Sequence, residues 1–361
     1  MTGRFLPPIG LAAAIALSSP TPVTAGQTAP AAKAKTTAAA KGNAPPRTPD
    51  GHPDLQGVWD FRNVIPLERP SQYAGKEFLT DQEAVEFTKL ASQLLDMDRR
   101  DEDQTNAGTT ALTVRAPSVV NGAPASADLA RAYNDFWWDY GKTFVGRKRT
   151  SLIVDPADGR IPPLTPEGQK RADEFAERRA RAAAGPEDRS VGERCLMGFN
   201  AGPPMLPGAY NNNMQLFQTP DYVAIVTEMV HNARIVPLDG RRHLSTPQWS
   251  GSSRGRWEGE TLVVETSNFH DATSFPSSSP TMHLVEKFSR VDSDTLLYEF
   301  TVSDPTTWTR SFTAQVPMRK SDEQLYEYAC HEGNYAMAGL LKAARAVEKS
   351  AGGGQPATVV R

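Results

Sequence analysis

Two histidines and a glutamate stand at the ends of β-forming runs in the C-terminal half of the chain. His231 follows one such run, and His331 and Glu332 follow the last one, residues 325–330. Histidine changes its charge near neutral pH, so a histidine and a carboxylate held in one pocket suit general acid–base catalysis. We therefore predict His231, His331 and Glu332 as candidate catalytic residues.

Five further residues are candidates for substrate binding. Arg254 and Arg256 could hold a substrate carboxylate or stabilise an enolate or phenolate. Tyr298 or Tyr328 could donate a phenolic proton, and Trp257 offers an aromatic surface. Together with the acid–base candidates, these residues predict a site for a small, partly apolar molecule.

A structural interpretation stands beside the catalytic one. A single histidine at the end of a strand is often an ordinary surface residue. Acids on strands with Arg or Lys nearby commonly form cross-strand ion pairs, which we expect of Glu265, Glu286 and Glu299. The catalytic interpretation requires the two histidines and Glu332 to meet in one pocket, and the sequence leaves this open.

The sequence shows few motifs of metal-dependent, cofactor-dependent or nucleophilic catalysis. The six histidines show no HxH or HExxH spacing, and there is no Walker loop or dinucleotide fingerprint, so we predict neither a metal nor a cofactor. Residues 251–255 (GSSRG) match the Gly-x-Ser-x-Gly spacing around Ser253. A nucleophile elbow needs a helix after the serine, whereas a β-hairpin is expected here, so we interpret this segment as a turn.

The elements that must position these residues form an antiparallel meander. β-Forming runs joined by tight turns extend over residues 211–332, and residues 57–61 add a strand. Six to eight such strands predict a β-barrel or a strongly curled sheet around a cavity. Alternation of apolar residues within the runs predicts that Trp59, Trp257 and Tyr298 are buried.

Helices are predicted in a middle segment, residues 80–185, and near the C-terminus. Thr80 and Glu83 form a capping box for the first helix, and Thr165, followed by a proline, caps a later one. Helices that cover a sheet make the chain an α+β protein. The predicted helices span residues 80–95, 128–140, 165–183 and 336–348.

The N-terminus predicts export to the periplasm or the outside of the cell. Arg4 precedes the apolar run Ile9–Leu17, and Val23–Ala25 offers a small-residue cleavage site. The apolar run is too short for a transmembrane helix, which needs about 20 residues. The predicted divisions are a signal peptide (1–25), a disordered linker rich in Ala, Lys and Pro (26–49), a single globular domain (50–348) and a flexible tail (349–361).

The chain has two cysteines, Cys195 and Cys330. In an oxidising compartment an even pair suggests a disulfide, which would close a loop of more than a hundred residues. Such a closure stabilises a fold by about 4–5 kcal/mol in the chain-entropy model. Metal ligation and a nucleophilic role are the alternatives, but two cysteines without CxxC spacing make a poor zinc site.

Several long motifs extend over residues 49–348 of the chain. They are PDGHPDLQGVWDF, SLIVDPADGRIPPLTPEG, VGERC, MVHNARIVPLDGR, WSGSSRGRWEGETLVVETSNF and YEYACHEGNY. Together they resemble a family of uncharacterised secreted bacterial proteins, and Gly57-Val58-Trp59 resembles the opening strand of the calycin barrels, the lipocalin group. The resemblance implies export and a calycin-like β-barrel with helical decoration.

These observations predict an exported protein that handles a small aromatic or apolar molecule. Our first hypothesis is a cofactor-independent lyase that uses acid–base chemistry. The alternatives are a lipocalin-like binding protein without catalysis and a cell-envelope interaction protein. A net charge of −3 argues against nucleic acid as a partner, because phosphate binding needs a clustered basic face. The sequence is silent on the oligomeric state.

Overall fold

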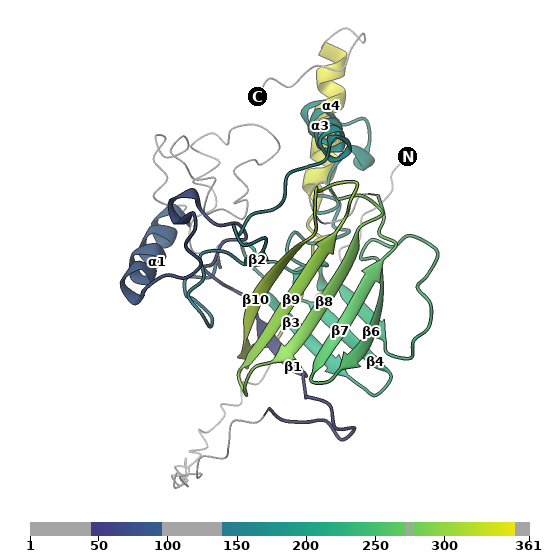
Figure 1. The fold of residues 1–361 in the computed structure, drawn as a ribbon. Helices are drawn as coiled ribbons and strands as arrows, with labels where there is room; N and C mark the ends of the chain where they lie inside the picture. Colours follow the sequence, from purple (N-terminus) through teal and green to yellow (C-terminus); the bar gives the residue numbers. More distant parts are fainter. Residues whose placement is uncertain (1–44, 96–138, 272–274, 276–277, 351–361) are drawn as a thin grey trace, which may run out of the picture. The chain divides into compact units, whose positions relative to one another are not determined.

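The computed structural model describes residues 45–95, 139–271, 275 and 278–350 (Figure 1). Within these ranges the chain forms an antiparallel sheet of ten strands and three α-helices, an α+β arrangement. The predicted signal peptide, the linker as far as residue 44, the helix expected over 128–140 as far as residue 138 and the tail from residue 351 lie outside the described residues. The strands are β1 (Gly57–Asp60), β2 (Ile153–Asp155), β3 (Asn213–Gln218), β4 (Tyr222–Thr227), β5 (Ala233–Pro237), β6 (Ser252–Glu258), β7 (Thr261–Ser267), β8 (His283–Arg290), β9 (Thr295–Ser303) and β10 (Phe312–Ser321).

Nine of these strands form a continuous hydrogen-bonded path. Its order is β5-β4-β3-β1-β10-β9-β8-β7-β6, and β2 pairs with β10 off this path. Most neighbours are also consecutive in sequence, which is the predicted meander. The end strands β5 and β6 are not hydrogen-bonded neighbours in the described sheet, so the sheet is not closed as a complete barrel would be.

The strand count sets the relative direction of the two end strands. Every pairing along the path is antiparallel, so strand direction alternates, and an odd number of strands leaves β5 and β6 parallel to each other. The two strands nevertheless approach through side chains. A Cβ atom at Gly255 of β6 would lie 2.8 Å from Val236 of β5, so only glycine fits there. We call the line along which β5 and β6 face each other the seam.

Alternation within the strands builds one hydrophobic core. In β9, Leu296, Tyr298, Phe300 and Val302 are all fully buried, while the residues between them are half-buried. Side chains from strands on both halves of the path join this core. The prediction of burial is confirmed for Trp59 and Tyr298, which are both 0% exposed.

Trp257 departs from that prediction because it lies near the tip of the β6–β7 hairpin. It is only half-buried, and its ring stacks on His52, with centroids 4.5 Å apart and an interplanar angle of 6°. Two of the expected cross-strand ion pairs are confirmed on the outer face. They are Lys287–Glu299 at 3.2 Å and Arg256–Glu265 at 2.6 Å.

The helices begin where their caps predict. The capping box at α1 is formed, since Glu83 N donates to Thr80 Oγ1 at 3.3 Å and Thr80 N donates to Glu83 Oε2 at 2.8 Å. Thr165 caps α3 by accepting a hydrogen bond from Gly168 N at 3.0 Å. The helices are α1 (Asp81–Leu95), α3 (Pro166–Ala180) and α4 (Tyr335–Ser350).

The strand predicted at residues 325–330 is wrong. The last strand is β10, which ends at Ser321, and residues 322–329 have no regular secondary structure. One backbone amide of this segment, that of Tyr326, donates to the buried carboxylate of Glu228 at 3.1 Å. Because residues 322–329 form no strand, His331 and Glu332 do not follow one.

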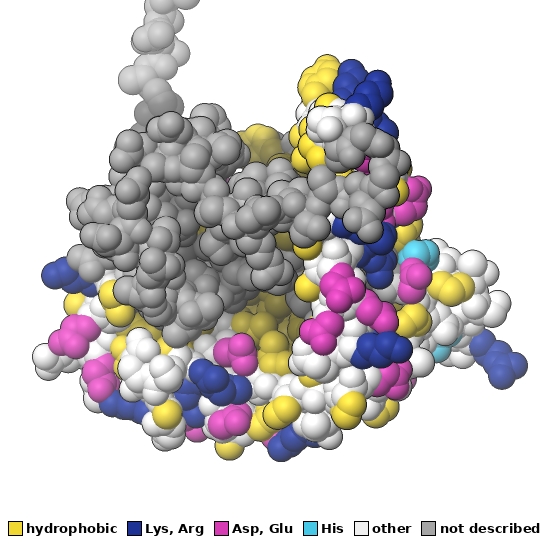
Figure 2. Space-filling view, turned by 90° about the horizontal axis from the view of Figure 1, so that it is seen from above, with side chains coloured by type: hydrophobic (Ala, Val, Ile, Leu, Met, Phe, Trp, Pro, Cys, Tyr) yellow, Lys and Arg dark blue, Asp and Glu magenta, His cyan; other side chains and the backbone are white. Residues whose placement is uncertain are grey.

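Charged side chains are mixed on the described surface. Seen from above, Lys and Arg side chains lie among Asp and Glu side chains (Figure 2). Among the described residues, no helix is long and apolar enough to cross a membrane.

Candidate functional site

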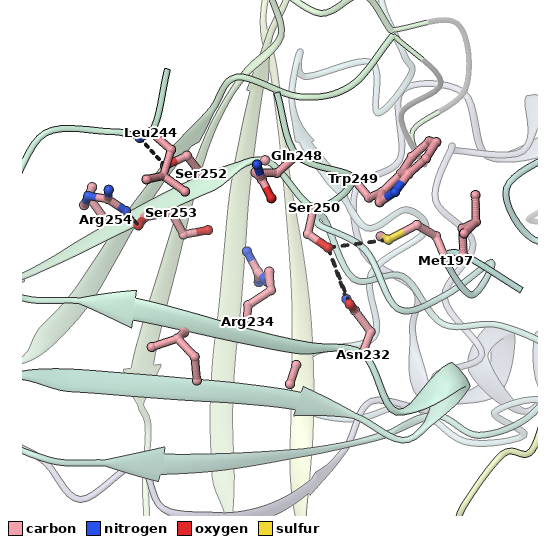
Figure 3. A pocket seen from close by; sticks show the side chains of 14 residues that line it. Met197, Asn232, Arg234, Leu244, Gln248, Trp249, Ser250, Ser252, Ser253 and Arg254 are labelled. Atoms are coloured by element: carbon pink, nitrogen blue, oxygen red, sulfur yellow. Dashed lines mark hydrogen bonds between the residues drawn. The ribbon is translucent and has the colours of Figure 1, made fainter. Parts of the chain in front are cut away.

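A pocket of about 310 Å³ lies at the seam (Figure 3). It is formed where the start of β5 faces the start of β6, and by the segments that precede Ser250 and follow Cys195. We call it the seam pocket. Its described lining residues are Leu196, Met197, Asn232, Ala233, Arg234, Ile235, Leu244, Gln248, Trp249, Ser250, Gly251, Ser252, Ser253 and Arg254.

Arg234 is the buried charged residue of this lining. Its side chain is 4% exposed and forms a two-pronged ion pair with Glu286 of β8, which is 0% exposed. Arg234 Nη1 donates to Glu286 Oε2 at 2.7 Å, and Nη2 donates to Oε1 at 2.8 Å. Figure 3 shows the guanidinium in the space below Ser253 and Gln248. The fork geometry fixes the orientation of the arginine within the pocket.

Tyr298 completes this buried network. Its hydroxyl donates to Glu286 Oε1 at 2.7 Å and accepts a hydrogen bond from Met205 N at 3.1 Å. Burial, together with the adjacent Glu286 charge, raises the pKa of Tyr298 well above its ordinary value. Burial opposes the charged form of Arg234, but the charge and hydrogen bonds of Glu286 outweigh it, so the pKa of Arg234 lies above its ordinary value. Arg234 is therefore a fixed cation.

The pocket lining offers hydrogen-bond donors, while Glu286 balances the charge of Arg234. A guanidinium has five N–H donors, and Arg234 uses two of its nitrogens on Glu286. Among the described lining residues there are two arginines, Arg234 and Arg254, and no Asp or Glu. Serine, asparagine and glutamine side chains supply further neutral hydrogen-bonding groups. The N–H groups of Arg234 that Glu286 does not use can donate to a polar group of a ligand, and a carboxylate is one such acceptor.

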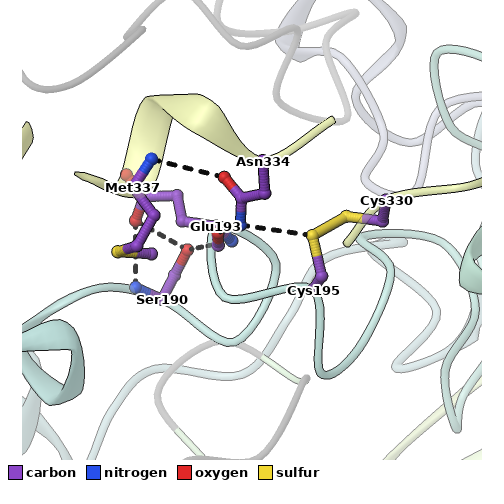
Figure 4. Close-up of a disulfide and its surroundings, with 6 residues drawn as sticks. All are labelled: Ser190, Glu193, Cys195, Cys330, Asn334 and Met337. Carbon is purple, nitrogen blue, oxygen red and sulfur yellow. Dashed lines mark hydrogen bonds between the residues drawn. A yellow bond between two sulfur atoms is a disulfide. The ribbon is translucent and has the colours of Figure 1, made fainter. Parts of the chain in front are cut away.

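The disulfide holds one wall of the pocket. Cys195 and Cys330 are bonded, as predicted, and Leu196 and Met197 of the lining follow Cys195 directly (Figure 4). Asn334 Nδ2 donates to Cys195 Sγ at 3.4 Å and to Glu193 O at 2.9 Å, which ties the same segment to the start of α4. The disulfide therefore anchors the segment that supplies the apolar lining residues Leu196 and Met197.

An aromatic cluster flanks the pocket beside Trp249. The His270 ring lies on Trp249 with centroids 4.1 Å apart, and His270 Nδ1 is 2.5 Å from Asp271 Oδ1. The guanidinium of Arg194 lies 5.7 Å from the Trp249 ring. A carboxylate that orients a histidine is an arrangement used in acid–base catalysis. Sequence analysis did not single out His270 or Trp249.

Backbone strain is located just before the β5 lining residues. Val230 has a φ of 57° and His231 a φ of 38°, both in the left-handed region that β-branched and bulky residues avoid. Asn232, which follows them, lines the pocket and donates to Ser250 Oγ at 3.4 Å. Strained residues are found at functional sites more often than elsewhere, which is consistent with a site here.

The predicted catalytic residues lie apart from this pocket. His231, His331 and Glu332 are all exposed, and none of them is among the described lining residues. Their predicted role in acid–base chemistry remains a prediction. Tyr328 is half-buried and lies against Tyr210, with ring centroids 6.1 Å apart.

The predicted substrate-binding residues are divided between the pocket, the core and the surface. Arg254 lines the pocket, but its guanidinium donates to the carbonyl oxygens of Arg241, Arg242 and its neighbour Ser253. Arg256 is an exposed residue paired with two glutamates, and Tyr298 lies in the core. Arg254 is thus the one predicted arginine that reaches the site.

Sequence analysis did not predict the Arg234–Glu286 pair, but the positions of both residues within their strands indicate it. Arg234 occupies the same strand face as buried Val236, and Glu286 the same face as buried Leu284 and Phe288. A charged residue at a core-facing position requires a partner, because an unpaired buried charge is very costly. Glu286 was predicted as an ordinary cross-strand pair, but its partner lies on β5, which is not a neighbouring strand.

Comparison with known protein families and curated proteins finds no match. The chain matches no model of a known protein family. A search of curated proteins likewise finds no similar sequence. Among the described residues, no group of three or more His, Cys, Asp or Glu side chains is placed to hold a metal ion.

Proposed function

We propose that the protein binds a small molecule that carries a carboxylate, and that the seam pocket holds this ligand. The observation that carries the proposal is Arg234, a buried cation in the lining whose orientation is fixed by Glu286. The apolar wall at Leu196 and Met197, with Trp249 beside it, suits a ligand that also has an apolar or aromatic part. A volume of about 310 Å³ fits a small ligand.

Binding without catalysis fits this lining best. The described residues that line the pocket include no histidine, acid, cysteine or tyrosine, so they offer no group that exchanges a proton near neutral pH. Two arginines, three serines, a glutamine and an asparagine can recognise a ligand but are poor proton carriers.

A cofactor-independent lyase is the second candidate, and His270 is the observation that favours it. Its ring lies on the pocket residue Trp249, and Asp271 is close enough to orient it. In that case His270 would move a proton on a ligand bound through Arg234. Product formation that requires His270, measured by chromatography with His270→Ala as the comparison, would make this the function.

We further propose that the open sheet is a variant of the calycin barrel, in which the seam gives the ligand access. Side-chain contact between Val236 and the Gly255 backbone supports this, because it brings the two ends of the sheet together. The Cys195–Cys330 disulfide is consistent with an oxidising compartment, and we place the protein in the periplasm or outside the cell.

The test replaces the buried ion pair with apolar residues of similar size, Arg234→Met with Glu286→Leu. Replacing both partners avoids leaving one buried charge unpaired, which would itself destabilise the fold. Calorimetry with benzoate, phenylacetate and their neutral amides should show carboxylate binding to the wild type, weakened at least tenfold in the double variant. Arg256→Met, an exposed arginine outside the pocket, should bind as the wild type does. Equal binding of acids and amides, or an unchanged double variant, would contradict the proposal.

A further inference from the structure

The backbone of β5 has an open edge inside the seam pocket. Asn232 O accepts a hydrogen bond from Thr227 N, and Leu238 N donates to Asp221 O, so these residues face β4. Backbone direction alternates along a strand, so the N–H and C=O groups of Ala233 and Ile235 face the seam. Both residues are exposed and line the pocket. An edge of this kind is a template for another strand.

The direction of the two end strands leaves a place for one more strand. β5 and β6 are parallel, so a strand inserted between them would be antiparallel to both. Antiparallel pairing is the arrangement of every other neighbour in this sheet. Strand direction alternates along the path but not between its two ends, because the path has nine strands. An inserted strand would restore the alternation of direction between β5 and β6.

The space for it is limited to the stretch after Asn232, whose side chain donates to Ser250 Oγ across the start of the seam at 3.4 Å. Val236 and Leu238 pack against Gly255 in the second half, where a Cβ would already be too close. Pro237, which faces the seam by the same alternation, has no N–H to offer there. A strand can therefore pair over Ala233 to Ile235, a length of about three residues.

Side-chain direction specifies the sequence of such a strand. In an antiparallel pair, directly opposed residues point to the same face of the sheet. The residue opposite Arg234 would point inward, to the guanidinium, and its two neighbours would point outward, beside exposed Ile235. An acidic side chain matches the first position and β-branched or other apolar side chains match the other two.

We propose that the ligand is an extended peptide segment with an acidic residue between two apolar residues, which adds as a strand to the open edge of β5. This inference rests on the proposed function, since it names the carboxylate that Arg234 binds. The main chain of the peptide provides affinity by pairing with Ala233 and Ile235, and the acid provides specificity.

The experiment uses acetyl-Thr-Val-Glu-Val-Thr-amide as the probe, with the full mature protein. We expect binding at least tenfold tighter than that of the same peptide with Gln in place of Glu, or with both valines N-methylated. Hydrogen exchange at the Ala233 and Ile235 amides should slow at least tenfold on binding. N-Acetylglutamate N-methylamide, which has the acid without the flanking strand, should bind more weakly and protect neither amide.

A proline variant tests the edge itself. Ile235→Pro removes an N–H that faces the seam, and Pro237 shows that β5 accepts proline at this kind of position. It should reduce peptide binding at least tenfold further than the matched variant Ile235→Ala, which loses the same side-chain contact but keeps the N–H. Unchanged melting of both variants shows that the fold is retained.

The outcomes separate the two proposals. Equal binding of the peptide, its N-methylated form and the single acetylated residue would overturn strand addition and leave the carboxylate site in place. If neither these probes nor benzoate and phenylacetate bind, the proposed function fails and the peptide proposal fails with it.

Discussion

Two arginine–glutamate pairs in this sheet have nearly the same contact distance and opposite surroundings. Arg234–Glu286 joins at 2.7 Å inside the sheet with side chains 4% and 0% exposed, and Arg256–Glu265 joins at 2.6 Å on the outer face with side chains 51% and 33% exposed. Contact distance does not distinguish them. Burial does, because charges removed from water lose their hydration and depend on each other.

The difference assigns separate roles to the two pairs. The inner pair links β5 to β8 across the interior and fixes a cation in the seam pocket. The outer pair joins neighbouring strands β6 and β7, where the backbone already holds them together. An exposed pair of this kind contributes little to stability because water and salt screen it. The following substitutions test this contrast.

The largest effect is expected from Glu286→Ala. This change leaves the Arg234 charge buried without its partner, which typically costs about 3–5 kcal/mol of unfolding free energy. Urea denaturation followed by tryptophan fluorescence measures it. A loss below about 1 kcal/mol would mean that water reaches Arg234, and the contrast with the outer pair would disappear.

Tyr298→Phe should have an intermediate effect. It removes a hydrogen bond to a charged group, worth about 1.5–3 kcal/mol, while it keeps the aromatic ring in the core. Circular dichroism melts at pH 7 provide the comparison with the wild type. No change in stability would show that the hydroxyl contributes nothing to the network.

The same variant should change the alkaline response. Burial raises the pKa of Tyr298 in the folded state, so above pH 10 the unfolded chain releases this proton and the folded protein keeps it. The unfolding free energy of the wild type therefore falls as pH rises through this range. The stability difference between the wild type and Tyr298→Phe should shrink between pH 9.5 and 11. A constant difference would contradict the raised pKa.

Replacing both members of the inner pair should cost less stability than removing Glu286 alone. In Arg234→Met with Glu286→Leu no charge is left unpaired, although the buried Tyr298 hydroxyl loses its acceptor. We expect a loss of about 1–3 kcal/mol of unfolding free energy, by the same measurement as for Glu286→Ala. A loss as large as that of Glu286→Ala alone would show that the pair itself, rather than the orphaned charge, determines stability.

The smallest effect is expected from Glu265→Ala in the outer pair. Exposed pairs contribute about 0.2–1 kcal/mol, and raising the salt concentration should reduce the difference further. Urea denaturation at low and high salt tests this. A loss comparable to that of Glu286→Ala would remove the distinction between the two faces of the sheet.

Local features of the fold could be predicted from the sequence because their causes lie within a few residues. Thr80 and Glu83 form their capping box, Thr165 caps α3, and the Gly259 turn closes the β6–β7 hairpin. Alternation along β9 gave the buried face of that strand correctly. The disulfide followed from the number of cysteines and the predicted compartment.

Predictions failed where the outcome depends on distant partners. Residues 325–330 have the composition of a strand, but one of their amides is bonded to the Glu228 carboxylate instead. The predicted convergence of His231, His331 and Glu332 assumed that this strand existed. Trp257 fits an alternating pattern, but its position near a hairpin tip leaves it half-exposed.

The sequence by itself determined the α+β class, the antiparallel meander, the caps and the buried face of β9. Only the tertiary structure decided that β5 and β6 end the sheet side by side and that Arg234 meets Glu286, 52 residues away. The physical reason is that alternation shows which face a side chain occupies but not what lies opposite it. The partner depends on how many strands the sheet contains and on where its two ends meet.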